Sequence, residues 1–315
     1  GGLRMGWIWA LAALLFALAA VGAAGYALFR YAMARDTARK PQNPEGTPWE
    51  PYQAQSRAWQ EAFWALGPVE VSLRSFDGLK LAGHYLPVEG SRRTILLMHG
   101  YRCKGGAGDF APMLATYRDM GLNILMVDQR SHAASEGTYI TFGALERRDC
   151  QSWLEYLNET YHPTDLFLAG VSMGCATVVL ALGLPLPANL RAVVADCGFT
   201  SPWEICAHVL KTSFRLPPFP LMHVANLFCR ALAHFDMKGC CTLSALRGNG
   251  VPVFFLHGAE DGFVPVGMTR RNAAACAAPH ELAIVPGAGH ALSLWVDGDA
   301  LRPRIRAFLE RYSTP

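Results

Sequence analysis

Short apolar runs alternate with longer amphipathic stretches over most of this chain. The short runs are rich in Val, Ile, Leu and Phe, and most end at Gly, Asp or His, which is typical of buried strands. The longer stretches repeat apolar residues every three to four positions, as helices do. This alternation predicts a mostly parallel sheet covered by helices on both faces, with the first hairpin antiparallel.

The pattern predicts eight strands and five helices. We expect the strands at 69–74, 81–86, 94–98, 123–127, 166–171, 191–196, 252–257 and 282–285. We expect the helices near 109–120, 145–160, 174–183, 266–277 and 299–312. In sheets of this kind, ligands bind outside the carboxyl ends of the parallel strands, so the chemistry should lie at that edge.

The segment from Trp7 to Phe29 has 23 residues without a charge and is followed by Arg30. That length is enough to span a bilayer, and aromatic residues stand near both ends, as interfacial aromatics do. A cleaved signal peptide is the alternative, because residues 22–24 (Gly-Ala-Ala) resemble a cleavage site. The uncharged stretch is long for a signal peptide, so we expect an uncleaved, single-pass N-terminal transmembrane helix.

The net charge of +3 is concentrated beside this segment. Residues 1–40 hold five Lys/Arg and one Asp (+4), and the remainder holds 23 basic and 24 acidic residues (−1). A near-neutral domain lacks the basic surface that binds nucleic acid. Arg30, Arg35, Arg39 and Lys40 follow the segment and only Arg4 precedes it, which by the positive-inside rule keeps the domain in the cytoplasm; residues ahead of Gly1 would change this count.

A long insertion runs from about Phe199 to Gly250 and exceeds a plain connection between elements. It contains two amphipathic patterns separated by residues 215–220. Their apolar positions are Trp203, Cys206, Val209, Leu210 and Phe214, then Leu221, Val224, Ala225, Phe228, Ala231, Leu232 and Phe235. We expect a small helical cap over the functional edge, with apolar side chains that suit an acyl chain. The alternative is a helical pair that only packs on the sheet.

The nine cysteines include no C-x-x-C pair, and Cys240 and Cys241 are adjacent. Adjacent cysteines suit neither ordinary disulfide geometry nor a standard zinc site. We therefore expect free thiols, several of them buried as small apolar side chains, and neither a metal nor an organic cofactor.

The pentapeptide Gly170-Val171-Ser172-Met173-Gly174 stands between an apolar strand run and a helical run. A G-x-S-x-G in this context is the nucleophile-elbow pattern, in which a strained turn lifts the serine hydroxyl above the sheet edge. The helix that follows adds backbone N–H groups and a favourable dipole for an oxyanion. An ordinary glycine-rich turn is the alternative. We take Ser172 as the candidate nucleophile.

A serine nucleophile needs an imidazole as base and a carboxylate that orients it. On sheets of this type the chain order is Ser, acid, His. Asp261 follows the strand run at 252–257, and His290 follows the last strand in a glycine-flanked loop. We expect these two residues to act with Ser172. Asp196, which ends an earlier strand, and Glu260 are the alternative acids.

Acyl transfer also needs two donors for the oxyanion of the tetrahedral intermediate. The first is the backbone N–H of Met173, the residue after the nucleophile. The second should come from the loop after the strand run at 94–98, where Gly100 permits a tight turn and Tyr101 supplies its N–H. The Tyr101 side chain either lines the pocket or covers the loop.

Together these residues resemble the α/β-hydrolase superfamily over about residues 69–312. Residues 128–137 (DQRSHAASEG) are similar to the Asp-x-Arg-Gly-His-Gly-x-Ser-x-Gly segment of many members, with Ser131 and Ala133 in place of the two inner glycines. Residues 75–81 resemble the first hairpin of these enzymes. The nearest resemblance is to membrane-anchored bacterial hydrolases related to the prolyl-oligopeptidase and serine-aminopeptidase branches, which implies the bacterial cell membrane as location.

The sequence therefore predicts an anchor and basic flank at 1–40, a linker with a helix at 41–68, and a catalytic α/β-hydrolase domain at 69–315 with the cap insertion at about 199–250. The expected activity is that of a carboxylesterase acting on a small ester or acyl substrate through an acyl-enzyme. A serine peptidase or aminopeptidase and a thioesterase use the same side chains and remain alternatives. A binding protein on the same fold is a remote alternative.

Overall fold

The computed structural model describes residues 2–35, 46–103 and 105–314. Within them, eight strands form one sheet in the order β1-β2-β4-β3-β5-β6-β7-β8. The strands are β1 (Val69–Arg74), β2 (Lys80–Leu86), β3 (Arg93–Met98), β4 (Asn123–Val127), β5 (Asp165–Val171), β6 (Leu190–Asp196), β7 (Val253–Gly258) and β8 (His280–Val285). β2 is antiparallel to β1 and β4, and all other neighbours are parallel. The predicted mostly parallel sheet is confirmed.

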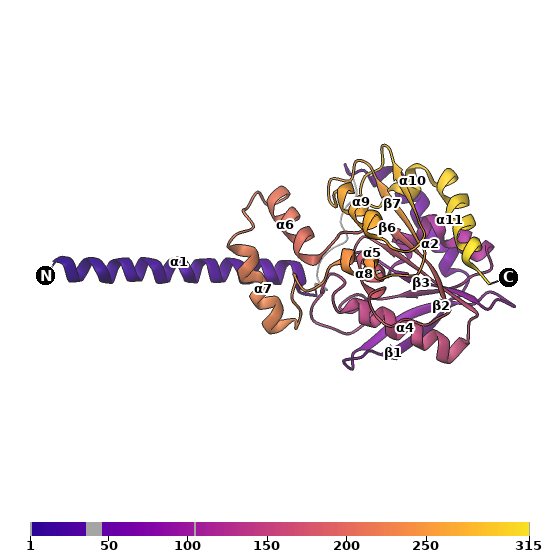
Figure 1. The fold of residues 1–315 in the computed structure, drawn as a ribbon, viewed down its shortest axis with the longest axis horizontal. Coiled ribbons are helices and arrows are strands. Elements are labelled where there is room, and N and C mark those ends of the chain that lie inside the picture. Colours follow the sequence, from indigo (N-terminus) through magenta and orange to yellow (C-terminus); the bar gives the residue numbers. More distant parts are fainter. Residues whose placement is uncertain (1, 36–45, 104, 315) are drawn as a thin grey trace.

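Helices cover both faces of the sheet (Figure 1). One face carries α2 (Gln53–Trp64), α3 (Ala107–Asp119), α10 (Ser293–Val296) and α11 (Gly298–Tyr312). The other carries α4 (Glu146–Tyr161), α5 (Met173–Ala181), α8 (Thr242–Arg247) and α9 (Val266–Ala275). A short 3₁₀ helix spans Glu50–Tyr52 ahead of α2.

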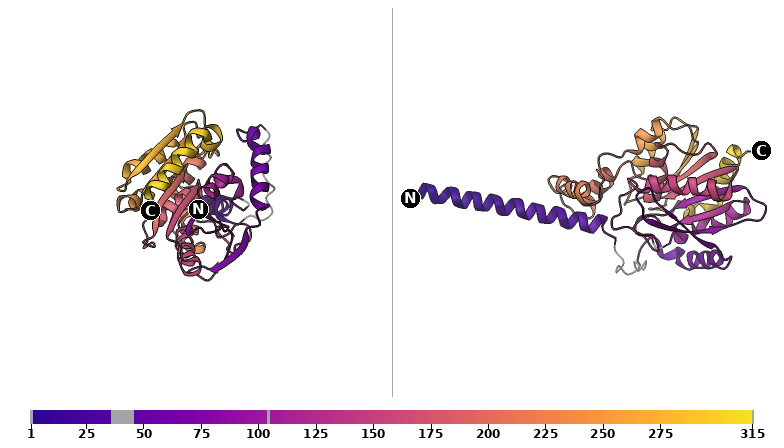
Figure 2. Two further views of the ribbon diagram at one scale, coloured as in Figure 1. Left: turned by 90° about the vertical axis from the view of Figure 1, so that its right-hand side faces the viewer. Right: turned by 90° about the horizontal axis from the view of Figure 1, so that it is seen from below.

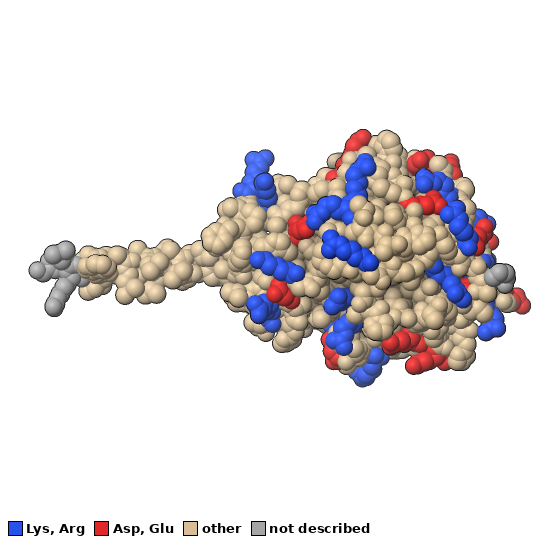
Figure 3. Space-filling model, viewed as in Figure 1, with Lys and Arg blue, Asp and Glu red and all other residues tan. Residues whose placement is uncertain are grey.

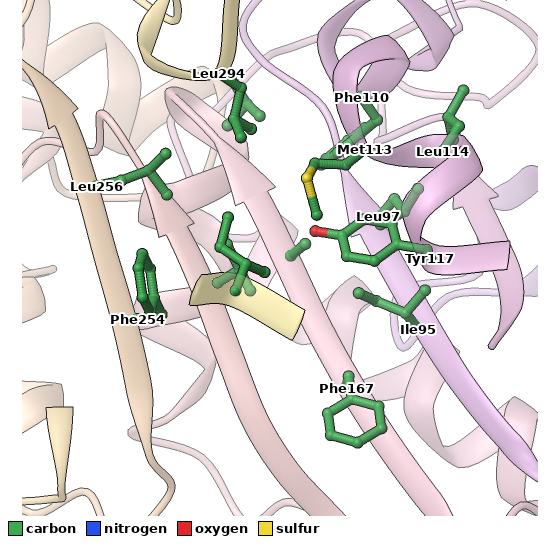
Figure 4. Close-up of a cluster of buried hydrophobic side chains, with 14 of the residues drawn as sticks. Ile95, Leu97, Phe110, Met113, Leu114, Tyr117, Phe167, Phe254, Leu256 and Leu294 are labelled. Atoms are coloured by element: carbon green, nitrogen blue, oxygen red, sulfur yellow. The ribbon is translucent and has the colours of Figure 1, made fainter. Parts of the chain in front are cut away.

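Strand side chains alternate between two apolar clusters, as the pleat requires. Ile95 and Leu97 of β3 pack with α3, whereas Leu96 and Met98 pack with α4 and α5. Figure 4 shows Ile95 and Leu97 on the same side of the sheet as Tyr117 of α3. Central strands buried on both faces read as continuous apolar runs, which is why the sequence locates them well.

The expected elements agree with the observed ones to within about three residues at each end. The sequence pattern missed α8 and α10, which have six and four residues and are too short to show a helical period. The helix expected in the linker at 41–68 is α2. Part of that linker, together with Arg39 and Lys40 of the basic flank, lies outside the described residues.

The N-terminal helix α1 (Gly2–Met33) projects from the domain (Figures 1 and 2). Its 28 residues from Gly6 to Met33 are mostly apolar and long enough to cross a membrane. Side chains from Gly6 to Ala20 are exposed, whereas Phe29 and Met33 are buried against the domain. We call Gly6 to Ala20 the bare part of α1, and the end of the helix that carries Phe29 and Met33 its packed part.

Two helices lie between β6 and β7, α6 (Pro202–Thr212) and α7 (Leu221–Leu232), and we call them the cap helices (Figure 1). Of the two, α7 lies beside the packed part of α1. The predicted apolar faces are partly correct, since Leu210 and Ala225 are buried but Phe214 and Leu232 are exposed. Phe214 lies beyond the end of α6 and Leu232 is the last residue of α7, so neither is held by the helical period. A third apolar cluster joins the cap helices, α1 and the start of α5.

Candidate active site

Ser172 lies in a tight turn between β5 and α5, with φ 55° and ψ −113°. A positive φ is costly for a residue with a side chain and persists only where its surroundings impose it. A Cβ on Gly170 would lie 2.3 Å from the Gly174 oxygen, and one on Gly174 would lie 1.8 Å from the Met98 oxygen. The Ser172 amide donates a 2.9 Å hydrogen bond to the Asp196 carbonyl. Both glycines of the pentapeptide are therefore sterically required.

His290 lies in the loop after β8 and bridges Ser172 and Asp261. Its Nδ1 is 2.7 Å from Asp261 Oδ2, and its Nε2 is 2.9 Å from Ser172 Oγ. Because an ionised carboxylate only accepts hydrogen bonds, we assign the proton to Nδ1 and the free lone pair to Nε2, facing the hydroxyl. The His290 side chain is 23% exposed and that of Asp261 is 0% exposed. The imidazole thus reaches solvent while its carboxylate partner does not.

Asp261 lies after β7 and has both carboxylate oxygens engaged. Oδ1 accepts 2.8 Å hydrogen bonds from the amides of Phe263 and Val264. Oδ2 accepts from His290 and from His257 Nε2, which is 3.0 Å away. Burial raises the pKa of Asp261, but the hydrogen bonds from His257 and His290 outweigh burial and hold that pKa well below its usual value. Asp261 is therefore ionised at neutral pH.

The loops that carry Asp261 and His290 touch each other where Gly258 ends β7. A Cβ on Gly258 would lie 2.2 Å from the Ala288 oxygen, so only glycine permits this approach. The Glu260 amide donates to the Ala288 carbonyl at 3.0 Å, and Glu260 Oε1 accepts from the Gly287 amide at 3.0 Å. Glu260, one of the alternative acids, thus ties the two loops together.

Asp196, the other alternative acid, ends β6 beside the serine turn. Its Oδ1 is buried without a hydrogen-bond partner in the described part of the chain. Burial raises the pKa of Asp196 to about 7. The carboxylate that the structure brings to His290 is that of Asp261.

The loop after β3 lies against Ser172. A Cβ on Gly100 would lie 3.6 Å from Ser172 Cβ, and the Gly100 amide donates a 2.6 Å hydrogen bond to Asp109 Oδ2. Met173 is the first residue of α5, where backbone N–H groups have no partner within the helix. Of the two expected donor residues, Met173 directly follows the serine at the start of α5, and Tyr101 follows Gly100 in the loop after β3.

The Tyr101 side chain packs against the third apolar cluster and reaches the end of α1. Its hydroxyl donates a 2.6 Å hydrogen bond to the Ala32 carbonyl near the end of α1, and its ring stacks on Phe142. The neighbouring Arg102 guanidinium donates to the Tyr31 carbonyl. Sequence reasoning missed this contact, because no local pattern links residues about 70 positions apart.

Two further residues of the site were missed as such. One is His257 of β7, whose Nδ1 is 2.7 Å from Thr269 Oγ1 and whose Nε2 is 2.9 Å from the Val264 carbonyl oxygen and 3.0 Å from Asp261 Oδ2. Asp109 anchors the Gly100 loop from the first turn of α3. The strand-end pair His257-Gly258 was a usable signal, whereas nothing in the sequence around Asp109 pointed to its partner.

Cys197, Asp261 and His290 place potential metal ligands within 4.8 Å of one another. Burial raises the pKa of the Cys197 thiol well above its usual value, so the thiol stays protonated. Metal binding needs the thiolate, and Asp261 and His290 are already bonded to each other. The three side chains therefore fit a hydrogen-bonded site better than a metal site.

Comparison with known proteins finds one matching family model and several similar proteins. Residues 95–303 match the model of the alpha/beta hydrolase family. YqkD of Bacillus subtilis is 26% identical over 251 residues, which cover 79% of this chain and 82% of YqkD. Rv2307c of Mycobacterium tuberculosis is 28% identical over 246 residues, which cover 76% of this chain and 78% of that protein.

Solved structures of esterases share the fold. The esterase Pf2001 of Pyrococcus furiosus aligns with a TM-score of 0.66 and 21% identity, covering 90% of this chain and 99% of the esterase. Est1E of Butyrivibrio proteoclasticus with ferulic acid bound aligns with a TM-score of 0.60 and 16% identity, covering 77% and 98%. The family match runs from β3 into α11 and includes the serine turn and the loops after β7 and β8, and this chain therefore belongs to the alpha/beta hydrolase family.

Proposed function

We propose that the protein is a serine hydrolase that cleaves carboxylic ester bonds through Ser172, His290 and Asp261. The observation that carries the proposal is the continuous chain of hydrogen bonds from the Ser172 hydroxyl through both nitrogens of His290 to Asp261. A hydroxyl held at 2.9 Å from a neutral imidazole nitrogen has its base in place before substrate arrives.

In the proposed cycle, His290 Nε2 takes the Ser172 proton while Oγ attacks the ester carbonyl carbon. The N–H groups of Met173 and Tyr101 stabilise the oxyanion. His290 then protonates the leaving alcohol, and the acyl group remains on Ser172. Water, deprotonated by His290, releases the acid and restores the serine, while Asp261 stabilises the imidazolium formed in both steps.

An ester is favoured over an amide by the surroundings of Met173. Phe142, Phe199 and Met173 belong to one apolar cluster with residues of the cap helices, which suits an acyl chain better than a charged peptide terminus. The likeness to Pf2001 and Est1E points the same way, although it extends to the fold alone. A peptidase or thioesterase remains the second candidate because each uses the same three side chains.

We further propose that α1 is an uncleaved anchor that holds the enzyme on the bacterial cell membrane. Fifteen consecutive exposed residues from Gly6 to Ala20 are what a lipid-facing helix requires and what a buried core helix lacks. Intact mass of the membrane-bound protein tests this proposal. A mass that lacks residues up to about position 24 would identify a cleaved signal peptide instead.

The activity is tested with p-nitrophenyl esters of rising acyl length, acyl thioesters and aminoacyl-p-nitroanilides, using the full chain in nanodiscs. Ser172→Ala is the test variant and Ser152→Ala, on the surface of α4, is the matched control. We expect ester turnover and fluorophosphonate labelling that only Ser172→Ala abolishes. Faster turnover of anilides or of thioesters would identify a peptidase or a thioesterase instead of an esterase. If the protein showed neither turnover nor labelling, we would conclude that it is a binding protein.

A further inference from the structure

The anchor helix is attached to the domain rigidly. Phe29 and Met33 are buried, and the residues after them continue into the domain by backbone pairing. The Ile140 amide donates to the Met33 carbonyl at 2.6 Å, and Ala34 forms an antiparallel bridge with Tyr139. The direction of α1 therefore determines how the domain faces any membrane that the helix enters.

Of the cap helices, α7 packs on the same part of α1. A Cβ on Gly25 would lie 2.4 Å from Val224 Cγ1, so α1 and α7 meet as closely as glycine allows. The Phe228 ring of α7 lies 5.0 Å from the Tyr26 ring and 6.1 Å from the Phe29 ring, between centroids. In Figures 1 and 2 the cap helices stand on the side of the domain from which the bare helix extends.

The bare part of α1 is too short to cross a bilayer alone. The 15 exposed residues from Gly6 to Ala20 span about 22 Å at 1.5 Å per residue, against a hydrocarbon core of about 30 Å. Arg4 bounds the uncharged segment on the other side. The missing length, about 8 Å or five residues, reaches Gly25, which is the level at which α7 packs on the helix.

Apolar side chains are exposed on α7 and in the connection between α6 and α7. Phe219 is 72% exposed, Leu227 is 61% exposed and Leu216 is 44% exposed, and we call these three residues the cap rim. Lys211 in the last turn of α6 and Arg215 in the connection between α6 and α7 are exposed too. Apolar side chains beside basic ones are the pattern of segments that lie in the headgroup layer of membranes with anionic lipids.

The charge distribution of the surface agrees with such a position. In Figure 3 the described bare part of α1 carries neither acidic nor basic side chains, and Lys and Arg appear where the helix reaches the domain and the cap. Residues 199–250 contain five basic and two acidic residues. Glu204, one of the two acids, is paired with Arg271 of α9 at 2.6 Å. The cap insertion therefore carries a net positive charge.

We propose that the cap rim lies in the headgroup layer of the bilayer that α1 enters, so that the protein contacts lipid through the cap as well as through its helix. The occupant of this surface is an anionic lipid bilayer. A second copy of the chain would cover the rim but would leave the membrane span about 8 Å short. The inference rests on the proposal that α1 is a membrane anchor.

Lipid photo-crosslinking of the full chain tests the inference. The protein is reconstituted in vesicles of phosphatidylcholine and phosphatidylglycerol that contain a diazirine-labelled phospholipid, and adducts are mapped by mass spectrometry. We expect adducts on residues 6–20 and on residues 214–227, with the cap adducts at least about fivefold weaker without phosphatidylglycerol. The exposed apolar residues Trp64, Leu66 and Val69, on α2 and β1 away from α1, are the internal control and should stay unlabelled.

A paired variant sharpens the result. Leu216→Asp with Phe219→Asp should reduce the cap adducts at least about fivefold while the α1 adducts stay unchanged. Adducts on α1 without adducts on the wild-type cap would overturn the inference and leave the anchor intact. Adducts on neither would remove the anchor proposal and this inference together. Protein–protein crosslinks at the rim in place of lipid adducts would identify a second copy as the occupant.

Discussion

At the sheet edge, Ser172, Asp261 and His290 stand on short loops that glycines and backbone hydrogen bonds hold in place. The junction of α1 with the cap helices is held mainly by apolar side chains from distant parts of the chain. At the sheet edge, single residues satisfy the steric requirements. The junction of α1 with the cap helices instead depends on apolar surfaces that fit one another. The comparison teaches that a reactive group needs geometry fixed to within fractions of an ångström, while a junction between helices can be built from packing. Tyr101 and Arg102 connect the two regions.

The largest expected effect is at the sheet edge. Ser172→Ala should lower kcat for the preferred ester by about 10⁴-fold or more, because the residual rate comes only from binding and the oxyanion donors. The thermal unfolding midpoint should change little, since the variant removes one hydroxyl. Steady-state kinetics with active-site titration check this prediction, and retention of more than a tenth of the activity would contradict it.

The second effect is at the helix junction. Gly25→Ala should destabilise the protein by about 1–3 kcal/mol, because its Cβ would lie 2.4 Å from Val224 Cγ1 and the helices must separate. Gly22→Ala is the matched control, because a Cβ there meets nothing within 4 Å. Thermal unfolding in detergent measures both variants. Equal midpoints for the two would mean that α1 and α7 do not pack as described.

The third effect concerns the buried Asp196 beside the serine turn. A carboxyl whose folded pKa of about 7 exceeds its unfolded value of about 4 binds more protons when folded, so its contribution to stability falls as pH rises from about 4 to about 7. Asp196→Asn should remove this decline, which at about 1.4 kcal/mol per pKa unit is worth about 3 kcal/mol between the two pH values measured. Denaturant unfolding at pH 4.5 and pH 7.5 measures it, with exposed Asp119→Asn as control. A wild type that becomes more stable relative to Asp196→Asn across this window would refute the assignment.

The fourth effect tests the connection between the regions. Tyr101→Phe removes the hydrogen bond to the Ala32 carbonyl while retaining the ring on Phe142. We expect kcat to fall about three- to tenfold with little change in KM, because the loss of one hydrogen bond, about 1 kcal/mol, loosens the loop that carries the Tyr101 N–H. Tyr312→Phe, at the end of α11, is the control. An unchanged kcat would mean that the anchor and the site are independent.

The smallest effect concerns the segment at 128–137. Ser131 and Ala133 have φ of 63° and 38°, so both occupy the left-handed region that favours glycine. Ala133→Gly should stabilise the protein by up to about 1 kcal/mol, since relief of strain is partly offset by the greater freedom of the unfolded chain. Arg35, whose guanidinium donates to the Ala133 carbonyl at 2.7 Å, holds the same turn. Calorimetry checks this prediction, and a clear loss of stability would contradict it.

The sequence by itself determined the order of the strands and helices along the chain, and it singled out Ser172, Asp261 and His290 as the candidate site. It did so because central strands buried on both faces show as apolar runs, and because a tight turn or close loop contact leaves glycine as the only residue that fits, as at Gly174 and Gly258. A steric requirement within one turn can thus be recognised from the few residues that form the turn.

Only the tertiary structure decided which residues support those three. Asp109, which holds the Gly100 loop, and the α1 carbonyl that accepts from Tyr101 come from elements whose sequences carry no sign of their partners. The exposed ends of the cap patterns, Phe214 and Leu232, were likewise unpredictable, because periodicity describes a helix face and says nothing of what packs against it. Long-range contacts depend on how the layers stack, and stacking is a property of the whole chain.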